Sequence, residues 1–73
     1  MPRLPSLKSR DIIRALQKAG FVEHRQKGSH KIFKKDQLRV TVPIHTRDLK
    51  KGTVFSIIEQ AELTIEQFLE LLK

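Results

Sequence analysis

The 73-residue chain contains no cysteine, no tryptophan and no tyrosine. Without cysteine it can form neither disulfide bonds nor thiolate metal sites, so the fold must rest on packing, and a reducing compartment is expected. No stretch approaches the roughly 20 consecutive apolar residues of a membrane-spanning helix, and the N-terminus lacks the apolar segment of a signal peptide. These absences predict a soluble cytoplasmic protein that has no membrane partner.

The short chain also limits the size of the hydrophobic core. Residues 1–73 are expected to form a single domain, because no repeat, linker or low-complexity tract divides them. A domain of this length buries only about 60 to 65% of the surface that its unfolded chain exposes. We therefore expect a small core and modest stability.

Positive charge is abundant and unevenly distributed. Residues 1–51 hold 14 Lys or Arg against four acidic residues, whereas residues 52–73 hold one against four. A basic body of this kind is typical of proteins that bind a polyanion such as RNA, although an acidic protein would be attracted by the same field. With no Trp or Tyr, base stacking would depend on the four Phe.

Apolar residues recur at helical spacing in three stretches. Ser9 can cap a first helix, with Asp11 in its first turn and Gly20 as its C-terminal stop. A second helix begins between residues 50 and 53. Thr64 and Gln67 form a capping box for a short last helix. The apolar faces of the first two helices contain Ile12, Ile13, Leu16, Ala19, Val54, Ile57, Ile58 and Ala61.

Three short strands are expected between the first two helices, over residues 21–26, 29–35 and 38–42, with turns at 27–28 and 36–37. Pro43 ends the third strand. Consecutive strands joined by short turns form an antiparallel sheet, and the two main helices would cover one of its faces. The sequence therefore predicts an α+β fold of order αβββα with an additional short C-terminal helix.

One histidine lies in the second strand among cations. Gly28 allows the backbone to turn sharply or to approach a ligand closely. If Phe33 enters the core, alternation places His30 on the open face of the sheet. Neighbouring lysines would keep the imidazole neutral, so that it can act as a general base, and would attract phosphate. These neighbours are Lys27, Lys31, Lys34 and Lys35.

Two further features are candidates for RNA contacts. Lys50 and Lys51 precede the second helix, where free backbone N–H groups can bind an anion, although simple capping by Thr53 explains the same residues. His45, in the following loop, can contact RNA, serve as a general acid or only hydrogen-bond its own loop. His24 has no assigned role. The histidines are widely spaced and no carboxylate clusters with them, so no metal or other cofactor is expected.

The motifs Gly28-Ser29-His30-Lys31-Ile32-Phe33, Val40-Thr41-Val42-Pro43-Ile44-His45 and Lys51-Gly52-Thr53-Val54 follow one another in an order and spacing that resemble the HicA (YcfA-like) toxins. The resemblance implies a fold like that of double-stranded-RNA-binding domains. It also implies an mRNA interferase of a type II toxin–antitoxin system, neutralised by a HicB-like antitoxin. The essential histidine of the family matches His30.

Two positions depart from the family pattern. Glu62 stands after the second helix where the family usually has Gly, and a left-handed backbone there would cost roughly 1 kcal/mol. Arg47 stands in a loop where many members have a small residue. Neither lies in the Gly-Ser-His motif.

The sequence thus predicts metal-independent cleavage of RNA by its own 2′-hydroxyl, with His30 as the general base. Two other functions fit the same charge: a non-catalytic RNA-binding module and a purely protein-binding role. The residues expected to contact RNA are Lys27, Gly28, Ser29, Lys31, Lys34, Lys35, His45, Lys50 and Lys51.

Overall fold

The computed structural model describes residues 3–73. The chain forms, in order, α1 (Ser9–Lys18), β1 (Val22–Lys27), β2 (His30–Lys35), β3 (Leu38–Pro43), α2 (Lys51–Gln60) and α3 (Ile65–Leu71). The predicted αβββα order with an added C-terminal helix is confirmed. In residues 3–73, no helix has the length and apolar character needed to span a membrane.

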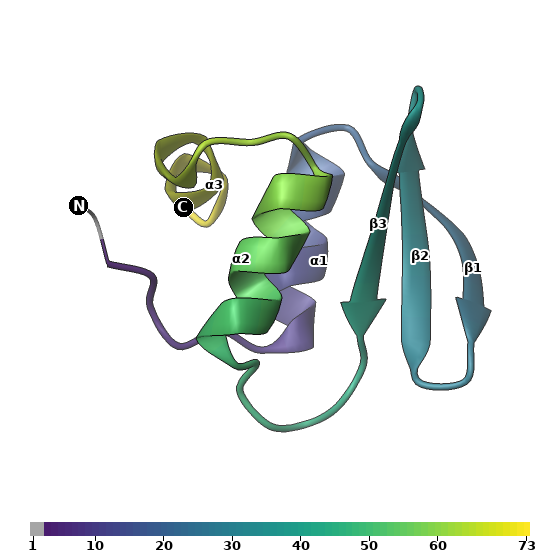
Figure 1. Ribbon diagram of the computed structural model, residues 1–73, viewed down its shortest axis with the longest axis horizontal. Helices are drawn as coiled ribbons and strands as arrows, with labels where there is room; N and C mark the ends of the chain where they lie inside the picture. The colour runs from purple at the N-terminus through teal and green to yellow at the C-terminus, as the bar shows by residue number, and fades with distance from the viewer. Residues whose placement is uncertain (1–2) are drawn as a thin grey trace.

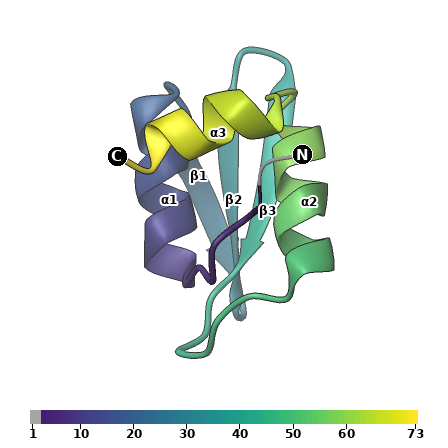
Figure 2. The same cartoon turned by 90° about the vertical axis from the view of Figure 1, so that its left-hand side faces the viewer.

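The three strands form one antiparallel sheet in the order β1-β2-β3. Both α1 and α2 lie on one face of this sheet, and α3 crosses over one end of them (Figures 1 and 2). The opposite face is not covered by a helix. This arrangement is that of a double-stranded-RNA-binding domain, as predicted.

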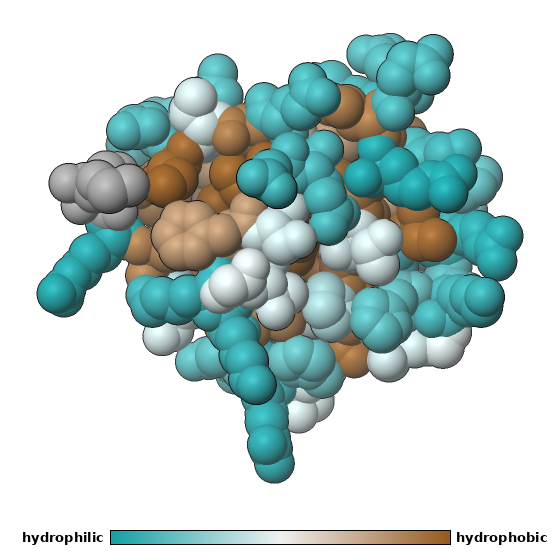
Figure 3. All heavy atoms as spheres, viewed as in Figure 1, coloured by the Kyte–Doolittle hydropathy of each residue, from teal (hydrophilic) through white to brown (hydrophobic). Residues whose placement is uncertain are grey.

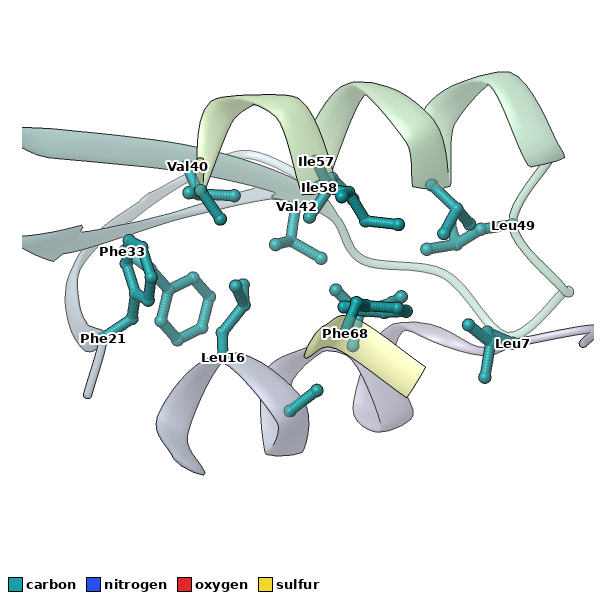
Figure 4. Packing of buried hydrophobic residues seen from close by; sticks show 14 of the residues in the cluster. Leu7, Leu16, Phe21, Phe33, Val40, Val42, Leu49, Ile57, Ile58 and Phe68 are labelled. Atoms are coloured by element: carbon teal, nitrogen blue, oxygen red, sulfur yellow. The ribbon is translucent and has the colours of Figure 1, made fainter. Parts of the chain in front are cut away.

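Apolar side chains from the sheet and from all three helices meet between these layers (Figure 4). Phe33 of β2 and Phe68 of α3 are both 0% exposed. The predicted stripes of α1 and α2 supply six of the other buried residues, although Ile13 and Ala19 are only partly buried. At about 25 cal/mol per Å² of buried apolar surface, these side chains are the main source of stability in a chain without cross-links. On the side of the molecule seen in Figure 3, hydrophilic side chains cover much of the surface, and apolar side chains are exposed between them.

Both main helices end in the same backbone motif. After α1, the N–H groups of Gly20 and Phe21 bond to the carbonyls of Gln17 and Leu16 at 3.0 and 2.9 Å. Gly20 has a φ of 101°, so the predicted stop is confirmed. The motif also buries Phe21, and β1 therefore begins one residue later than predicted.

Glu62 occupies the corresponding position after α2. The bonds from Glu62 N–H to the Glu59 carbonyl and from Leu63 N–H to the Ile58 carbonyl measure 3.0 and 3.1 Å. Glu62 has a φ of 56°, the left-handed conformation that favours glycine. The expected strain at this departure from the family pattern is therefore present.

The start of α1 differs from the prediction. Lys8 is the N-cap residue, and its N–H donates to the Asp11 carboxylate at 3.0 Å. Ser9 is the first helical residue, and its hydroxyl donates to the Pro43 carbonyl at 2.6 Å instead of capping the helix. The nearby carboxylate can satisfy the free N–H, which leaves the serine available for a contact distant in sequence. The Thr64 and Gln67 capping box at the start of α3 is confirmed, with bonds of 3.0 and 2.8 Å.

Candidate functional site

The turn between β1 and β2, the loop after β3 and the first turns of α1 and α2 lie at the same end of the molecule (Figure 1). We call this the His30 end, comprising residues 8–10, 27–31 and 43–51. The Ile44 N–H donates to the Ser29 carbonyl at 2.6 Å, which joins the loop to the turn. The Ser9 bond to Pro43 joins the same loop to α1.

A two-residue turn, Gly28-Ser29, leads into β2. Gly28 has a φ of 59°, and a positive φ at the first turn residue is the pattern of a type II′ hairpin turn. A Cβ at Gly28 would meet no heavy atom within 4 Å. Conformation, not crowding, therefore requires glycine here, and the space beside the turn is open to a ligand.

His30 is exposed at the first position of β2 and pairs with Lys27 on one side and with Pro43 on the other. Because Phe33 points into the core, alternation along the strand places His30 on the open face. Paired residues share a face, so Lys27 lies directly beside His30. The predicted orientation of Phe33 and the exposure of His30 are confirmed.

Lys31 alternates to the helix-covered face and forms an ion pair with Glu23 at 3.3 Å. It lines a cavity of about 330 Å³ at the start of α1, together with Lys8, Arg10 and His45. This cavity brings together one residue from a strand, two from the beginning of a helix and one from a loop. Its four basic side chains make it suitable for a phosphate group.

Lys50 and Lys51 stand at the start of α2, as predicted. Lys50 is the N-cap residue and has no side-chain capping bond, so capping by Thr53, the third residue of the helix, is wrong. Lys50, His45 and Thr53 line a second cavity of about 360 Å³. The Lys51 ammonium donates to the Leu4 carbonyl at 2.5 Å, which fastens the N-terminal segment to α2.

Lys34 and Lys35 lie at the opposite end of β2 from His30. Lys34 is four residues after His30 in the strand, which is a distance of about 13 Å. The Lys35 ammonium donates to the Ala19 carbonyl at the end of α1, at 2.6 Å. Sequence proximity suggested that all four lysines surround the histidine, but the extended strand carries these two away from it.

Lys34 instead has a second histidine as its neighbour. The pairing of β1 with β2 shifts between Glu23 and Arg25, so His24 is the extra residue of a β-bulge. The positive charge of Lys34 lowers the pKa of His24 below its ordinary value of 6.5. Desolvation, Arg39 and Arg25 lower this pKa further. The imidazole therefore lies among cations on the open face.

A comparison with known protein families gives a match over most of this fold. The family model described as the HicA toxin of bacterial toxin-antitoxin matches residues 9–63, which run from the start of α1 to the motif that ends α2. The chain belongs to the HicA toxin family. It is thus a toxin of a bacterial toxin–antitoxin system, with a cognate antitoxin as partner. No curated protein matches the chain.

Sequence reasoning missed several basic residues of this HicA-family fold. Lys8 and Arg10 join the cavity at the His30 end because Ser9 bonds to the end of β3. Arg25 and Arg39 join the open face through strand register. Period-two alternation could have found Arg39, but no local signal marks the bulge at His24. In the described chain, no group of three or more His, Asp or Glu side chains is arranged to hold a metal ion.

Proposed function

We propose that this HicA-family toxin is an mRNA interferase that cleaves RNA without a metal ion, with His30 as the general base. The observation that carries the proposal is the position of His30, exposed on the open face and paired with Lys27 beside a glycine turn. An exposed imidazole can reach an RNA strand, and the adjacent ammonium attracts its phosphate.

In the proposed reaction, His30 accepts the proton of a ribose 2′-hydroxyl. The 2′-oxygen then attacks the adjacent phosphorus, and the bond from phosphorus to the 5′-oxygen breaks. The products are a 2′,3′-cyclic phosphate and a 5′-hydroxyl end, and the leaving oxygen takes its proton from a general acid or from water. His45, in the loop that bonds to the turn before His30, is the candidate acid.

The cations of the His30 end would hold the substrate and stabilise the charge that develops on phosphorus. Lys27 lies beside His30, and the space beside Gly28 is open to a close approach. Lys31 and His45 line one cavity, and Lys50 lines the neighbouring one. In this proposal an imidazole base and fixed cations supply the chemistry.

The cognate antitoxin is proposed to be HicB-like and to act where the mRNA is, in the cytoplasm. An acidic surface on it would be steered to the basic His30 end and would block access to His30. Mapping of protected residues in the complex tests this arrangement. An antitoxin that leaves His30 open to solvent would contradict steric blocking.

The test of the enzyme is cleavage of labelled RNA by the purified chain and by His30→Ala, in the presence of EDTA. The wild-type protein should cut and leave cyclic phosphate ends, and the variant should lose at least about 10² to 10⁴ in rate. Because His30 is exposed, its removal leaves no cavity and the melting temperature should stay nearly constant. A folded variant that cuts at the wild-type rate would overturn the role of His30.

A non-catalytic RNA-binding module is the second candidate. The cavity that holds Lys8, Arg10 and Lys31 opens on the helix side of the sheet, whereas His30 lies on the open face. RNA could be held by that cavity alone, with no phosphate at the imidazole. Wild-type protein that binds RNA with steep salt dependence, yet never cuts it, would favour this function.

A further inference from the structure

The open face of the sheet carries a high density of positive charge along its whole length. Strand register and alternation place six basic or titratable residues there. They are His24, Arg25, Lys27, His30, Lys34 and Arg39. None of the described residues that alternate to this face in the three strands is Asp or Glu.

Two of these cations face each other directly. Lys34 and Arg39 are register partners in the β2–β3 pair. Like charges directly opposite each other destabilise a sheet. The nearest acidic residues do not offset the repulsion, because Glu23 bonds to Lys31 on the helix side and Asp36 lies in the turn.

The bulge in β1 adds to this concentration of charge. The extra residue at His24 interrupts the alternation, so that His24 and Arg25 are both presented to the open face. The lowered pKa of His24 reports the nearness of Lys34, Arg39 and Arg25. This part of the sheet thus contains both a like-charge pair and a bulge, each of which is unfavourable for a regular sheet. Such departures from local stability rules are expected at functional sites.

We propose that Arg25, Lys34 and Arg39, gathered around His24, form a phosphate-binding strip that holds the backbone of single-stranded RNA. The inference rests on the proposed function, since the strip would hold the strand that is cut at His30. The three cations make charge-assisted contacts to phosphate oxygens, and a phosphate also relieves the repulsion between Lys34 and Arg39.

The distance from the strip to His30 sets the minimum length of RNA that can contact both. About 13 Å separates Lys34 from His30 along β2, so one phosphate cannot contact both, and a dinucleotide has only one internucleotide phosphate. An RNA strand lying along β2 would place one phosphate at His30 and another at the strip. A dinucleotide would reach only one of the two.

RNA fits this face better than a protein partner does. The apolar strand residues on this face are Val22, Ile32 and Pro43, and no Trp, Tyr, Phe or Met of the described strands alternates to it to form the energetic centre of a protein interface. The strip would contact the sugar-phosphate backbone, so it would bind RNA irrespective of base sequence. Specificity would then come from the His30 end.

The direct test is binding of an oligouridine with 2′-O-methyl groups on every sugar, which cannot be cut through the 2′-hydroxyl. The variant combines Lys34→Gln with Arg39→Gln. The control combines Arg14→Gln with Lys73→Gln, which remove the same charge from α1 and from the C-terminal residue. Loss of two phosphate contacts should reduce the salt slope by up to about 1.4 and the affinity by about 25-fold at 0.1 M salt. The control should bind nearly as the wild type does.

Melting temperature separates a binding role from a structural one. Removing the facing cations should raise the melting temperature of the strip variant, while RNA binding falls. A lower melting temperature would mean that the two residues stabilise the sheet. Affinity equal to that of the control would overturn the strip.

Cleavage of two substrates distinguishes the strip from the proposed function. The strip variant should cut a dinucleotide at the wild-type rate and a longer RNA more slowly at subsaturating concentration. If the wild type cuts neither, the proposed enzyme fails, whereas the binding test of the strip still stands. If the variant binds RNA normally but loses its acidic antitoxin, the face belongs to the protein partner and the proposal is wrong.

Discussion

The Ser9 hydroxyl donates a 2.6 Å hydrogen bond to the Pro43 carbonyl and accepts one from the His45 N–H at 3.3 Å. Ser9 is only 5% exposed. These bonds connect the first turn of α1 to the end of β3 and to the loop that follows. A single hydroxyl therefore fixes where His45 lies relative to the basic residues of α1.

Ser9→Ala should lower the free energy of unfolding by about 1 to 3 kcal/mol, because two backbone groups lose their partner in a largely buried place. Cleavage of RNA should also fall if His45 contributes to it. Urea unfolding measures the first effect. Ser6→Ala, in the exposed part of the N-terminal segment, is the control and should stay within about 0.5 kcal/mol of the wild type. Equal stabilities of the two variants would contradict a structural role for Ser9.

Lys50 and Lys51 should respond differently to replacement. Lys50→Ala should flatten the salt dependence of RNA binding by up to about 0.7 in slope without changing stability. Lys51→Ala should in addition lower the melting temperature, because the Lys51 ammonium fastens the N-terminal segment through Leu4. Binding titrations at several salt concentrations and thermal melts separate the two effects. An unchanged slope in both variants would show that the start of α2 does not bind phosphate.

Glu62→Gly should stabilise the protein by about 0.5 to 1 kcal/mol. The left-handed conformation costs about 1 to 2 kcal/mol for a residue with a Cβ, and the more flexible unfolded chain of glycine offsets part of the gain. Asp36 provides a matched control, since its φ of 54° is close to the 56° of Glu62. Asp tolerates this conformation better than Glu, so Asp36→Gly should gain less. A loss of stability in Glu62→Gly would exclude strain at this helix end.

The lowered pKa of His24 predicts a pH dependence of stability. Its folded-state pKa lies below the ordinary value of 6.5, so the unfolded chain binds the proton more readily. The contribution to stability is therefore present above about pH 6.5 and is lost as the pH falls through the folded-state pKa. Urea unfolding of the wild type and of His24→Gln at pH 7.5 and below pH 6 should show a smaller loss in the variant. Identical pH dependence in both proteins would contradict the proximity of the cations.

Much of the fold could be predicted because the apolar pattern is strong. Each helix has buried apolar residues at helical spacing, represented by Leu16 in α1, Ile57 in α2 and Phe68 in α3. Alternation around Phe33 decides which face of the sheet His30 occupies. The errors at element ends come from backbone hydrogen bonds. The Phe21 N–H bonds to the Leu16 carbonyl at the end of α1, so Phe21 is not part of β1. At the start of α1, the Asp11 carboxylate accepts the N–H of Lys8 and caps the helix in place of Ser9.

The candidate site was only partly predictable. The Gly28 turn and His30 could be found because they are adjacent in sequence. Lys27 could be found as a neighbour of His30, but Lys34 and Lys35 were wrongly expected there, since Lys34 is near in sequence but about 13 Å away along the strand. Arg10 reaches the basic cavity only through tertiary contacts, and the bulge that exposes His24 depends on the register of two strands.

The sheet has two outer edges, and the chain protects them in different ways. At β3 the Gln60 side chain of α2 accepts the outward Thr41 N–H at 3.0 Å, so the helix occupies the edge. At β1 charged side chains and the bulge at His24 interrupt the straight row of backbone groups on which another strand would pair. The charge that we propose attracts RNA therefore also opposes edge-to-edge aggregation, and variants that neutralise it should be tested for solubility as well as for activity.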